Sequence, residues 1–586
     1  MMIRLLLGSS LLGGMLMAGV PELGHPRLLF LKGEEGKVRE RIARDAVAAT
    51  LHEAVVAEAK GVLKGRTCRY EIPDGKRLLR ESRLAIHNVV HPAMLWRLGE
   101  GEEYRLRVIK ELDAACALKD WNPTHFLDTA EMATAVAIGY DWLYPTLSAE
   151  QRGRYEEALI EKALKPAKKV YDSKGWWSQV KNNWSQVCGA GIGLAAAAVW
   201  EREPELCENL FRSGVKLVEG CGAFYRPDGV YPEGPGYWHY GTNYQVLMLA
   251  ACASLGEKIE VEPALRKSGE FMLQMIGPTS YDFNFADVGS SRAGVTPAQC
   301  WVASHFQDAG QAKAVREWVV WDPRRAAGDR LGALSLLWLP AEPGGEAPAP
   351  KTFSMYGGEQ PMAFLRNGWE KESAWLAIKG GTGAASHGHL DAGSFVYEAG
   401  GVRWFVDLGS DDYNMPGYFG KQRWEYFRLN NRSHNTLVID GRLQEAPKEP
   451  CPIVDHGEKG EERWVTIDLG RAYRGQAEKV LRRATFDRAG GGVVLQDGIE
   501  KPVGAVRWAV VTDAEVKLEG AEVRLRKEGR TLLLKREDGG GGAWEVADAK
   551  PPTEREKQNE GYRVVSFTAP KADVLKLKVG WALVKE

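Results

Sequence analysis

Residues 340–350 read Pro-Ala-Glu-Pro-Gly-Gly-Glu-Ala-Pro-Ala-Pro, and this stretch divides the chain into two halves of different character. Proline and glycine at this density are typical of turns and linkers. Before the stretch, apolar residues recur at the three- and four-residue spacing of helices, and after it they alternate with the period of two that strands show. The stretch therefore predicts a linker between a helical domain and a β domain.

The half that precedes the linker is predicted to be helical. Apolar residues recur at helical spacing through residues 36–63, and Ser148 with Gln151 forms a capping box that marks the start of another helix. Residues 183–200 combine closely spaced glycines with a run of alanines, which favours a helix packed closely against its neighbours. Because no repeat of fixed period is visible, we expect an (α/α) toroid, an incomplete barrel, in preference to a regular solenoid.

The half that follows the linker is predicted to be an antiparallel β-sandwich. Glycine-rich turns separate its stretches of alternating apolar and polar residues. The predicted strands cover residues 374–378, 394–397, 402–406, 436–439, 464–469, 493–496, 506–511 and 523–526. The whole chain therefore predicts a signal peptide at 1–18, a toroid domain at 19–339, a linker at 340–350 and a β-sandwich domain at 351–586.

Composition limits the class of protein. The 77 Lys and Arg residues balance 78 Asp and Glu residues, so the chain lacks the basic excess of a nucleic-acid-binding protein and we expect no such partner. Arg4, the short apolar segment 5–17 and Ala18 predict a removed signal peptide, and hence a periplasmic or secreted protein without a membrane span. Eight cysteines without a Cys-x-x-Cys pair argue against a disulfide scaffold and a cysteine zinc site.

Histidine and aspartate gather in the β half. Residues 386–391 read Ser-His-Gly-His-Leu-Asp, and on a strand His387 and His389 would share one face. Asp407 and His434 follow on neighbouring predicted strands. Two imidazoles and one carboxylate can fill three positions of a zinc site. The alternative is that these side chains are polar groups satisfied by hydrogen bonds at strand ends.

The segment between Asp407 and His434 is rich in aromatic and basic residues, including Tyr413, Tyr418 and Arg423. Neither period fits it, so we predict a loop. Such a loop can stack sugar rings and attract anions, or it can be a packed corner of the β domain.

The helical half contains further candidate residues. Asn183 opens a predicted helix, where it can be an N-cap or face a ligand. Proline and glycine stiffen the predicted loop 226–241, which carries Glu233, Tyr237, His239 and Tyr240. Two other polar segments, 125–131 and 283–289, are interpreted as helix caps and loop hydrogen bonds.

Five segments together resemble the heparinase II/III-like family. They are NNWSQVCGAGIGLAA (182–196), PDGVYPEGPGYWHYGTNY (227–244), SHGHLDAGSFVYEAGGVRWFVDLG (386–409), NMPGYFGKQRW (414–424) and RSHNTLVIDG (432–441). Members of this family are polysaccharide lyases that cut uronic-acid glycans such as heparin, heparan sulfate or alginate. They combine an (α/α) toroid with a C-terminal antiparallel β-sandwich, which agrees with the architecture predicted above.

The resemblance implies catalytic roles. Asn183 resembles the residue that neutralises the uronate carboxylate, although Trp184 stands where some related enzymes carry a histidine. Tyr240 resembles the catalytic tyrosine, with Tyr237, three residues earlier, as its alternative. His387 resembles a histidine that faces the cleft. The resemblance does not assign the roles of base and acid between His387 and Tyr240.

It also implies supporting residues. Tyr418 resembles a second aromatic acid or base, with Tyr413 as its alternative. The expected substrate-binding residues are Glu233, Tyr237, His239, Tyr413 and Arg423. The expected ligands of a structural Zn²⁺ ion are His389, Asp407 and His434.

The chemistry explains these residue types. A lyase removes the C5 proton of a uronate and expels the 4-O-linked sugar, which leaves a C4–C5 double bond. The carboxylate must be neutralised, a base must take the proton and an acid must protonate the leaving oxygen. The expected partner is thus an anionic polysaccharide, while the oligomeric state stays open, with a homodimer as one option.

Two other functions compete with this one. A glycoside hydrolase would use a pair of carboxylates, for which the helical half offers Asp128, Glu131, Asp228, Glu233 and Asp287. A non-catalytic glycan-binding protein would keep the fold without turnover, and Trp184 keeps that alternative open.

Overall fold

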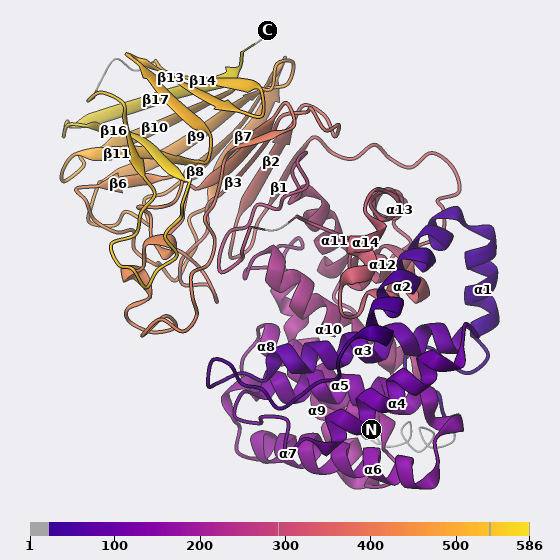
Figure 1. Ribbon diagram of the computed structural model, residues 1–586. Helices are drawn as coiled ribbons and strands as arrows, with labels where there is room; N and C mark the ends of the chain where they lie inside the picture. Colours follow the sequence, from indigo (N-terminus) through magenta and orange to yellow (C-terminus); the bar gives the residue numbers. More distant parts are fainter. Residues whose placement is uncertain (1–22, 291, 538–540, 585–586) are drawn as a thin grey trace, which may run out of the picture.

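The computed structural model describes residues 23–290, 292–537 and 541–584, so the predicted signal peptide lies outside the described residues. Helices form the first part of the chain and antiparallel strands form the second (Figure 1). This order confirms the predicted fold class. Among the described residues, no helix combines the length and apolar character that crossing a bilayer requires.

The helical domain has an inner and an outer layer. Successive inner helices pack side by side, and every residue of α5 is buried. The inner helices are α3 (Leu79–Arg97), α5 (Phe126–Leu143), α8 (Asn183–Ala198), α10 (Pro235–Ser254) and α12 (Pro297–His305). The outer helices are α2 (Ala46–Lys64), α4 (Glu102–Ala117), α6 (Ala149–Leu159), α7 (Lys165–Asp172), α9 (Pro204–Cys221), α11 (Ala264–Gln274) and α13 (Ala309–Trp321).

Short helices occupy the last position of the ring. They are α14 (Pro323–Gly328), η7 (Gly332–Leu334) and α15 (Ser335–Trp338), and they pack against α2, α3 and α12. A full-length helix does not fill this position in the described part of the chain, which agrees with the predicted incomplete barrel.

Local signals explain where some helices begin. The predicted helix over 36–63 is wrong in one respect, because it is divided into α1 (Glu35–Arg44) and α2. Asp45 adopts an extended conformation between them, and its carboxylate accepts hydrogen bonds from the N–H groups of Val47 and Ala48. The capping box of Ser148 and Gln151 is present, and α6 continues through a π-turn, η4 (Ile160–Leu164), into α7.

A five-stranded antiparallel sheet lies between the helices and the other sheets (Figure 1). Phe364 and Trp375 point into the core of the helical domain, whereas Leu365 and Leu376 point into the core of the β domain. Because both faces are covered, most of these strands are buried along their whole length. The strands, in order, are β1 (Phe353–Tyr356), β2 (Met362–Arg366), β3 (Trp375–Lys379), β4 (Phe395–Ala399) and β5 (Val402–Phe405).

Two further sheets complete the β domain. Strands such as β9 alternate buried and accessible residues, as expected for a sheet with one covered face. The eight-stranded sheet has the order β12 (Glu515–Glu519), β13 (Glu522–Lys527), β14 (Arg530–Arg536), β17 (Val574–Leu583), β10 (Val493–Glu500), β9 (Lys479–Asp487), β8 (Glu462–Asp468) and β7 (Ile453–Lys459). The four-stranded sheet has the order β15 (Glu545–Asp548), β16 (Arg563–Ala569), β11 (Val506–Thr512) and β6 (Leu437–Ile439).

The segment that follows α11 is bound to the first sheet. The guanidinium of Arg403 donates hydrogen bonds to the carbonyl oxygens of Asp282 (2.8 Å) and Tyr281 (2.9 Å). The N–H of Thr279 donates to the carboxylate of Glu398 over 2.7 Å. These contacts fix residues 279–282 against β4 and β5 and bring the next residues of the helical domain close to the loop between β3 and β4.

Candidate active site and metal centre

Asp287 connects the two domains at the centre of the site. Its Oδ2 accepts a hydrogen bond from His387 Nδ1 (2.9 Å), and its Oδ1 accepts from His389 Nε2 (3.0 Å) and the Tyr418 hydroxyl (2.7 Å). Arg423 Nη2 lies 3.0 Å from the same Oδ1. Burial alone would raise the pKa of Asp287, but the histidine hydrogen bonds and the Arg423 charge hold it well below its usual value.

His387 lies in the loop between β3 and β4, so the prediction that it shares a strand face with His389 is wrong. Its φ of +60° is in the left-handed region, and the Arg423 guanidinium fixes this turn by donating to the carbonyl oxygens of His387 (3.0 Å) and Gly388 (2.9 Å). Its side chain is 11% exposed. Because Nδ1 donates to Asp287, Nε2 carries the lone pair and is the atom that can accept a proton.

Tyr237 stacks on His387. The ring centroids are 4.0 Å apart and the planes are inclined by 15°. The hydroxyls of Tyr237 and Tyr413 are 2.6 Å apart, and burial raises the pKa of both phenols. Tyr237 therefore keeps its proton at neutral pH and can act as a proton donor.

The predicted loop 226–241 ends earlier than expected, because α10 begins at Pro235. Tyr237, His239 and Tyr240 are therefore helical residues. Tyr240 lies three residues after Tyr237, on the same face of the helix. Its ring contacts the guanidinium groups of Arg83 (4.9 Å) and Arg330 (5.2 Å).

His239 has a different environment. Burial lowers its pKa to about 4, and the nearest charges are those of Asp329 and Arg325. It is therefore neutral at physiological pH. Among the described residues, the structure does not bring His239 into the group of side chains around His387.

Asn183 and Glu233 form a buried pair. The Nδ2 of Asn183 donates to both carboxylate oxygens of Glu233 (2.9 and 3.1 Å), and the Asn183 N–H also donates to Glu233 over 3.1 Å. The N-cap of α8 is Asn182, whose side chain accepts from the N–H of Trp184. Glu233 Oε1 lies 3.8 Å from His387 Nε2, which places this pair beside the stacked rings.

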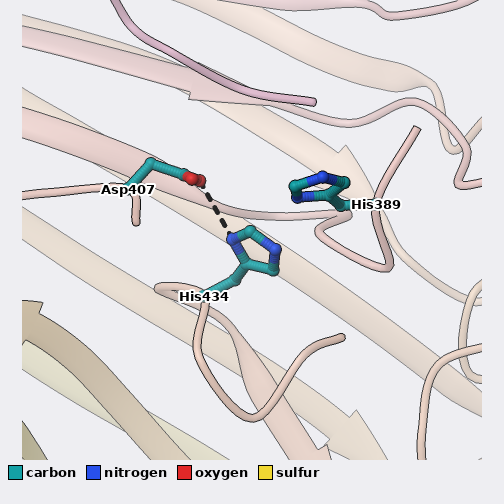
Figure 2. Close-up of side chains that lie close together, drawn as sticks. All are labelled: His389, Asp407 and His434. Atoms are coloured by element: carbon teal, nitrogen blue, oxygen red, sulfur yellow. Dashed lines mark hydrogen bonds and ion pairs between the residues drawn. The ribbon is translucent and has the colours of Figure 1, made fainter. Parts of the chain in front are cut away.

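His389, Asp407 and His434 come together as predicted (Figure 2). One potential ligand atom from each residue lies within 4.8 Å of the others, and all three side chains are buried. His434 Nδ1 donates to Asp407 over 2.9 Å, which leaves the lone pair on Nε2. His389 donates through Nε2, which leaves the lone pair on Nδ1.

These two lone pairs lack partners. Among the described residues, His389 Nδ1 and His434 Nε2 are buried and have no hydrogen-bond partner. Buried imidazole nitrogens normally have one. Two free imidazole lone pairs and a carboxylate are a donor set that suits a divalent metal ion such as zinc, so the residues present fit the predicted metal.

Each of the five carboxylates proposed for a hydrolase has at least one hydrogen-bond or ion-pair partner. Asp128 accepts from Leu78 N–H, Asn122 and His125, and Asp228 accepts from Gly357 N–H. Glu131 is paired with arginines, Glu233 holds Asn183, and Asp287 has the partners described above. The arrangement therefore offers little support for a pair of free catalytic carboxylates.

Asp287 was predicted only as one of the candidate carboxylates of a hydrolase, and not as a partner of the two histidines. It lies in the polar segment 283–289, which was interpreted as loop hydrogen bonding. That interpretation is incomplete, because the partners of Asp287 lie 100 or more positions away. An isolated acidic residue in an irregular, otherwise buried segment was the available signal, but the sequence cannot name such distant partners.

The fold and this site define a two-domain protein of the toroid and β-sandwich class. Residues 363–573 match the family model described as heparinase II/III-like, C-terminal, which confirms the predicted resemblance over this part of the chain. No match is found among curated proteins.

Solved structures resemble the chain over both domains. A heparinase III has a TM-score of 0.59 at 14% identity, with coverage of 89% of this chain and 79% of that chain. A mutant of the heparan sulfate lyase HepC from Pedobacter heparinus has a TM-score of 0.57 at 12% identity, with coverage of 97% and 93%. A Paenibacillus xanthan lyase has a TM-score of 0.50 at 13% identity, with coverage of 96% and 60%. At these identities the similarity shows the fold.

Proposed function

We propose that this protein is a polysaccharide lyase that cleaves uronic-acid glycans by β-elimination. The observation that carries the proposal is the stack of Tyr237 on His387 beside the Asn183–Glu233 pair. It places a protonated phenol, an imidazole lone pair and an amide donor together, which are the groups that elimination requires. The family match and the lyases among the structural neighbours support the same reaction class.

In the proposed reaction, Asn183 donates one of its two amide hydrogens to the uronate carboxylate, while Glu233 accepts the other. This contact lowers the negative charge that opposes loss of the C5 proton. His387 Nε2 takes the C5 proton, while Asp287 holds Nδ1–H and stabilises the imidazolium that forms. Tyr237, whose raised pKa keeps it protonated, donates to the leaving 4-oxygen.

Other residues would support these groups. Tyr413 hydrogen-bonds to Tyr237 and would hold its hydroxyl in position. The hydroxyl of Tyr418 is directed at Asp287, so we assign Tyr418 a positioning role in place of a catalytic one. Tyr240 contacts arginines, and we therefore prefer Tyr237 as the proton donor.

His389, Asp407 and His434 would hold a zinc ion. When bound, the ion would supply a rigid link between the loop that carries His387 and the segments after β5 and before β6 that carry its other two ligands. Because His389 also donates to Asp287, this link would fix the position of the carboxylate that orients His387.

Ultraviolet absorbance during incubation with uronate polysaccharides tests the function. The panel comprises heparin, heparan sulfate, chondroitin and dermatan sulfates, hyaluronan, alginate and a polyglucuronate. We expect a conjugated C4–C5 double bond with at least one member. New reducing ends without this absorbance would identify a hydrolase, and the absence of both on every member would contradict the proposal. The predicted signal peptide also supports export to the periplasm or the medium, which cell fractionation checks.

A further inference from the structure

A buried ion cluster lies beside the proposed catalytic residues. Glu131, on inner helix α5, is fully buried. Its Oε1 lies 3.1 Å from Arg83 Nε, and its Oε2 lies 2.8 Å from Arg330 Nε. Burial alone would raise the pKa of Glu131, but the charges of Arg330 and Arg83 outweigh it and lower the pKa. One carboxylate thus faces two guanidinium groups, and the charge of Asp329 also acts on Arg330.

The guanidinium of Arg83 is the accessible one of the two. Its Nε is held by Glu131, yet 40% of its side chain is exposed, against 17% for Arg330. Among the described residues, the Nη1 and Nη2 atoms of Arg83 have no hydrogen-bond partner, and Glu131 is its ion-pair partner. A guanidinium held at Nε and open at both terminal nitrogens is a planar fork that matches a carboxylate or a sulfate group.

The position of this fork relates it to the proposed reaction. The Arg83 guanidinium lies 4.9 Å from the centre of the Tyr240 ring, and Tyr240 lies one helical turn after Tyr237. The charge of Arg83 also acts on the Tyr237 phenol, opposing part of the rise in its pKa that burial causes. The open fork therefore lies against Tyr240, one helical turn from the phenol proposed as the proton donor.

We propose that Arg83 is an oxyanion-binding residue that takes a carboxylate or a sulfate group of the glycan, with Glu131 holding its guanidinium in place. The inference rests on the proposed function only for the identity of the ligand as an anionic sugar. The exposed guanidinium of Arg83 attracts the anion, and the fixed Nε reduces the rotamer entropy that binding would otherwise remove. A neutral sugar at this position would leave the charge unpaired.

A binding experiment tests the proposal without any requirement for turnover. Sodium glucuronate is titrated into the full-length protein and followed by ligand-observed NMR, with glucose as the neutral probe. The variants are Arg83→Gln and Arg83→Lys. The control is Arg212→Gln, because Arg212 on outer helix α9 is also paired with a glutamate, Glu208, and is 42% exposed. Circular dichroism verifies that each variant is folded.

We expect saturable binding of glucuronate to the wild type and to Arg212→Gln. Arg83→Gln should weaken it roughly tenfold or more, since a charge-assisted bidentate contact is lost, and Arg83→Lys should retain part of it. Inorganic sulfate should displace glucuronate if the fork accepts either oxyanion, and a failure to do so would restrict the site to carboxylates.

Two results would overturn the inference. One is equal glucuronate affinity in folded Arg83→Gln and wild type, and the other is no saturable binding to the wild type. Both are independent of the lyase assay. Loss of binding in Arg83→Gln without any unsaturated product would support the anion site while contradicting the lyase.

Discussion

The ring of Tyr237, from the helical domain, stacks on the imidazole of His387, from the β domain, at a centroid distance of 4.0 Å. The proposed proton donor and proton acceptor thus belong to different domains. Their alignment depends on the interface, where Asp287 of the helical domain also binds both histidines of the β3–β4 loop. Substitutions at this junction are therefore expected to lower activity more than they destabilise either hydrophobic core.

Tyr237→Phe should remove the proposed proton donor while keeping the stacked ring. We expect kcat to fall by about 10²–10⁴-fold, the range for a general acid. Loss of the hydrogen bond to Tyr413 should lower the free energy of unfolding by only about 1 kcal/mol. Tyr240→Phe is the matched control, with a smaller expected effect on kcat. A larger fall of kcat in Tyr240→Phe than in Tyr237→Phe would assign the role of proton donor to Tyr240.

Asp287→Asn should disrupt the link between the domains. The amide cannot accept from His387, His389 and Tyr418 as the carboxylate does, and Arg423 would lose its charged partner. We expect a loss of about 3 kcal/mol in the free energy of unfolding, typical of a broken buried ion pair, and a large fall in kcat. Urea denaturation and steady-state kinetics measure these effects. Tyr418→Phe, which removes one donor only, should be milder in both, and equal effects would argue against a central role for Asp287.

The metal site predicts one zinc ion per chain in the purified protein, measured by elemental analysis. Removal of the ion by a chelator should lower Tm, because a free zinc concentration of about 1,000 times Kd stabilises the folded protein by about 4 kcal/mol. His434→Ala should abolish zinc retention. His456→Ala is the control because His456 is exposed on β7. Zinc in the His434→Ala protein at the wild-type level would place the ion elsewhere.

Glu131→Gln should change how stability depends on pH. The pKa of Glu131 is lowered in the folded protein, so its ionised form contributes stability above the unfolded-state pKa of about 4.3. This contribution is lost as the pH falls through the lower folded-state value. We therefore expect the variant to be less stable than the wild type by about 3 kcal/mol at pH 7 and the difference to shrink toward pH 3. A difference that stays constant over this range would contradict the expectation.

Asp282→Asn should act in the opposite sense. Burial raises the pKa of Asp282 to about 7, so the folded protein binds this proton more tightly than the unfolded chain does. Its contribution to stability is present below the unfolded-state pKa of about 3.9 and is lost as the pH rises toward 7, by up to about 4 kcal/mol. Removing the ionisable group should make the variant relatively more stable at pH 8 than at pH 4. Denaturation series at both pH values measure this, and equal differences would contradict it.

Local patterns predicted the fold well. Three signals depend only on residues that are close in the sequence, so they can be recognised in it directly. They are the composition of the linker, the change of period and the capping box of Ser148. The break between α1 and α2 was missed, because the apolar spacing continues through Asp45 and only its capping hydrogen bonds end the first helix. The continuous burial of β2 was not expected either, since a strand covered on both faces shows no alternation.

The site was predicted in part. His389, Asp407 and His434 could be grouped because the resemblance supplied their association, and the structure brings them together. The proposed roles of Asp287 and Arg83 could not be predicted from the sequence, because they depend on contacts across domains or between inner helices. Composition shows that such charged residues exist, but only tertiary packing determines which of them share a buried environment.

The five-stranded sheet has a consequence for engineering. A cut at the linker looks convenient, yet it would leave the sheet with Phe364 and Trp375 uncovered on the face that the helices now bury. Such an apolar surface favours aggregation. Each half is therefore expected to express poorly by itself. A chimera that takes one half from a relative would also need the side chains of the five-stranded sheet that face the helices, such as Phe364 and Trp375. The two domains are therefore expected to be exchanged only together, because the five-stranded sheet contributes to the cores of both.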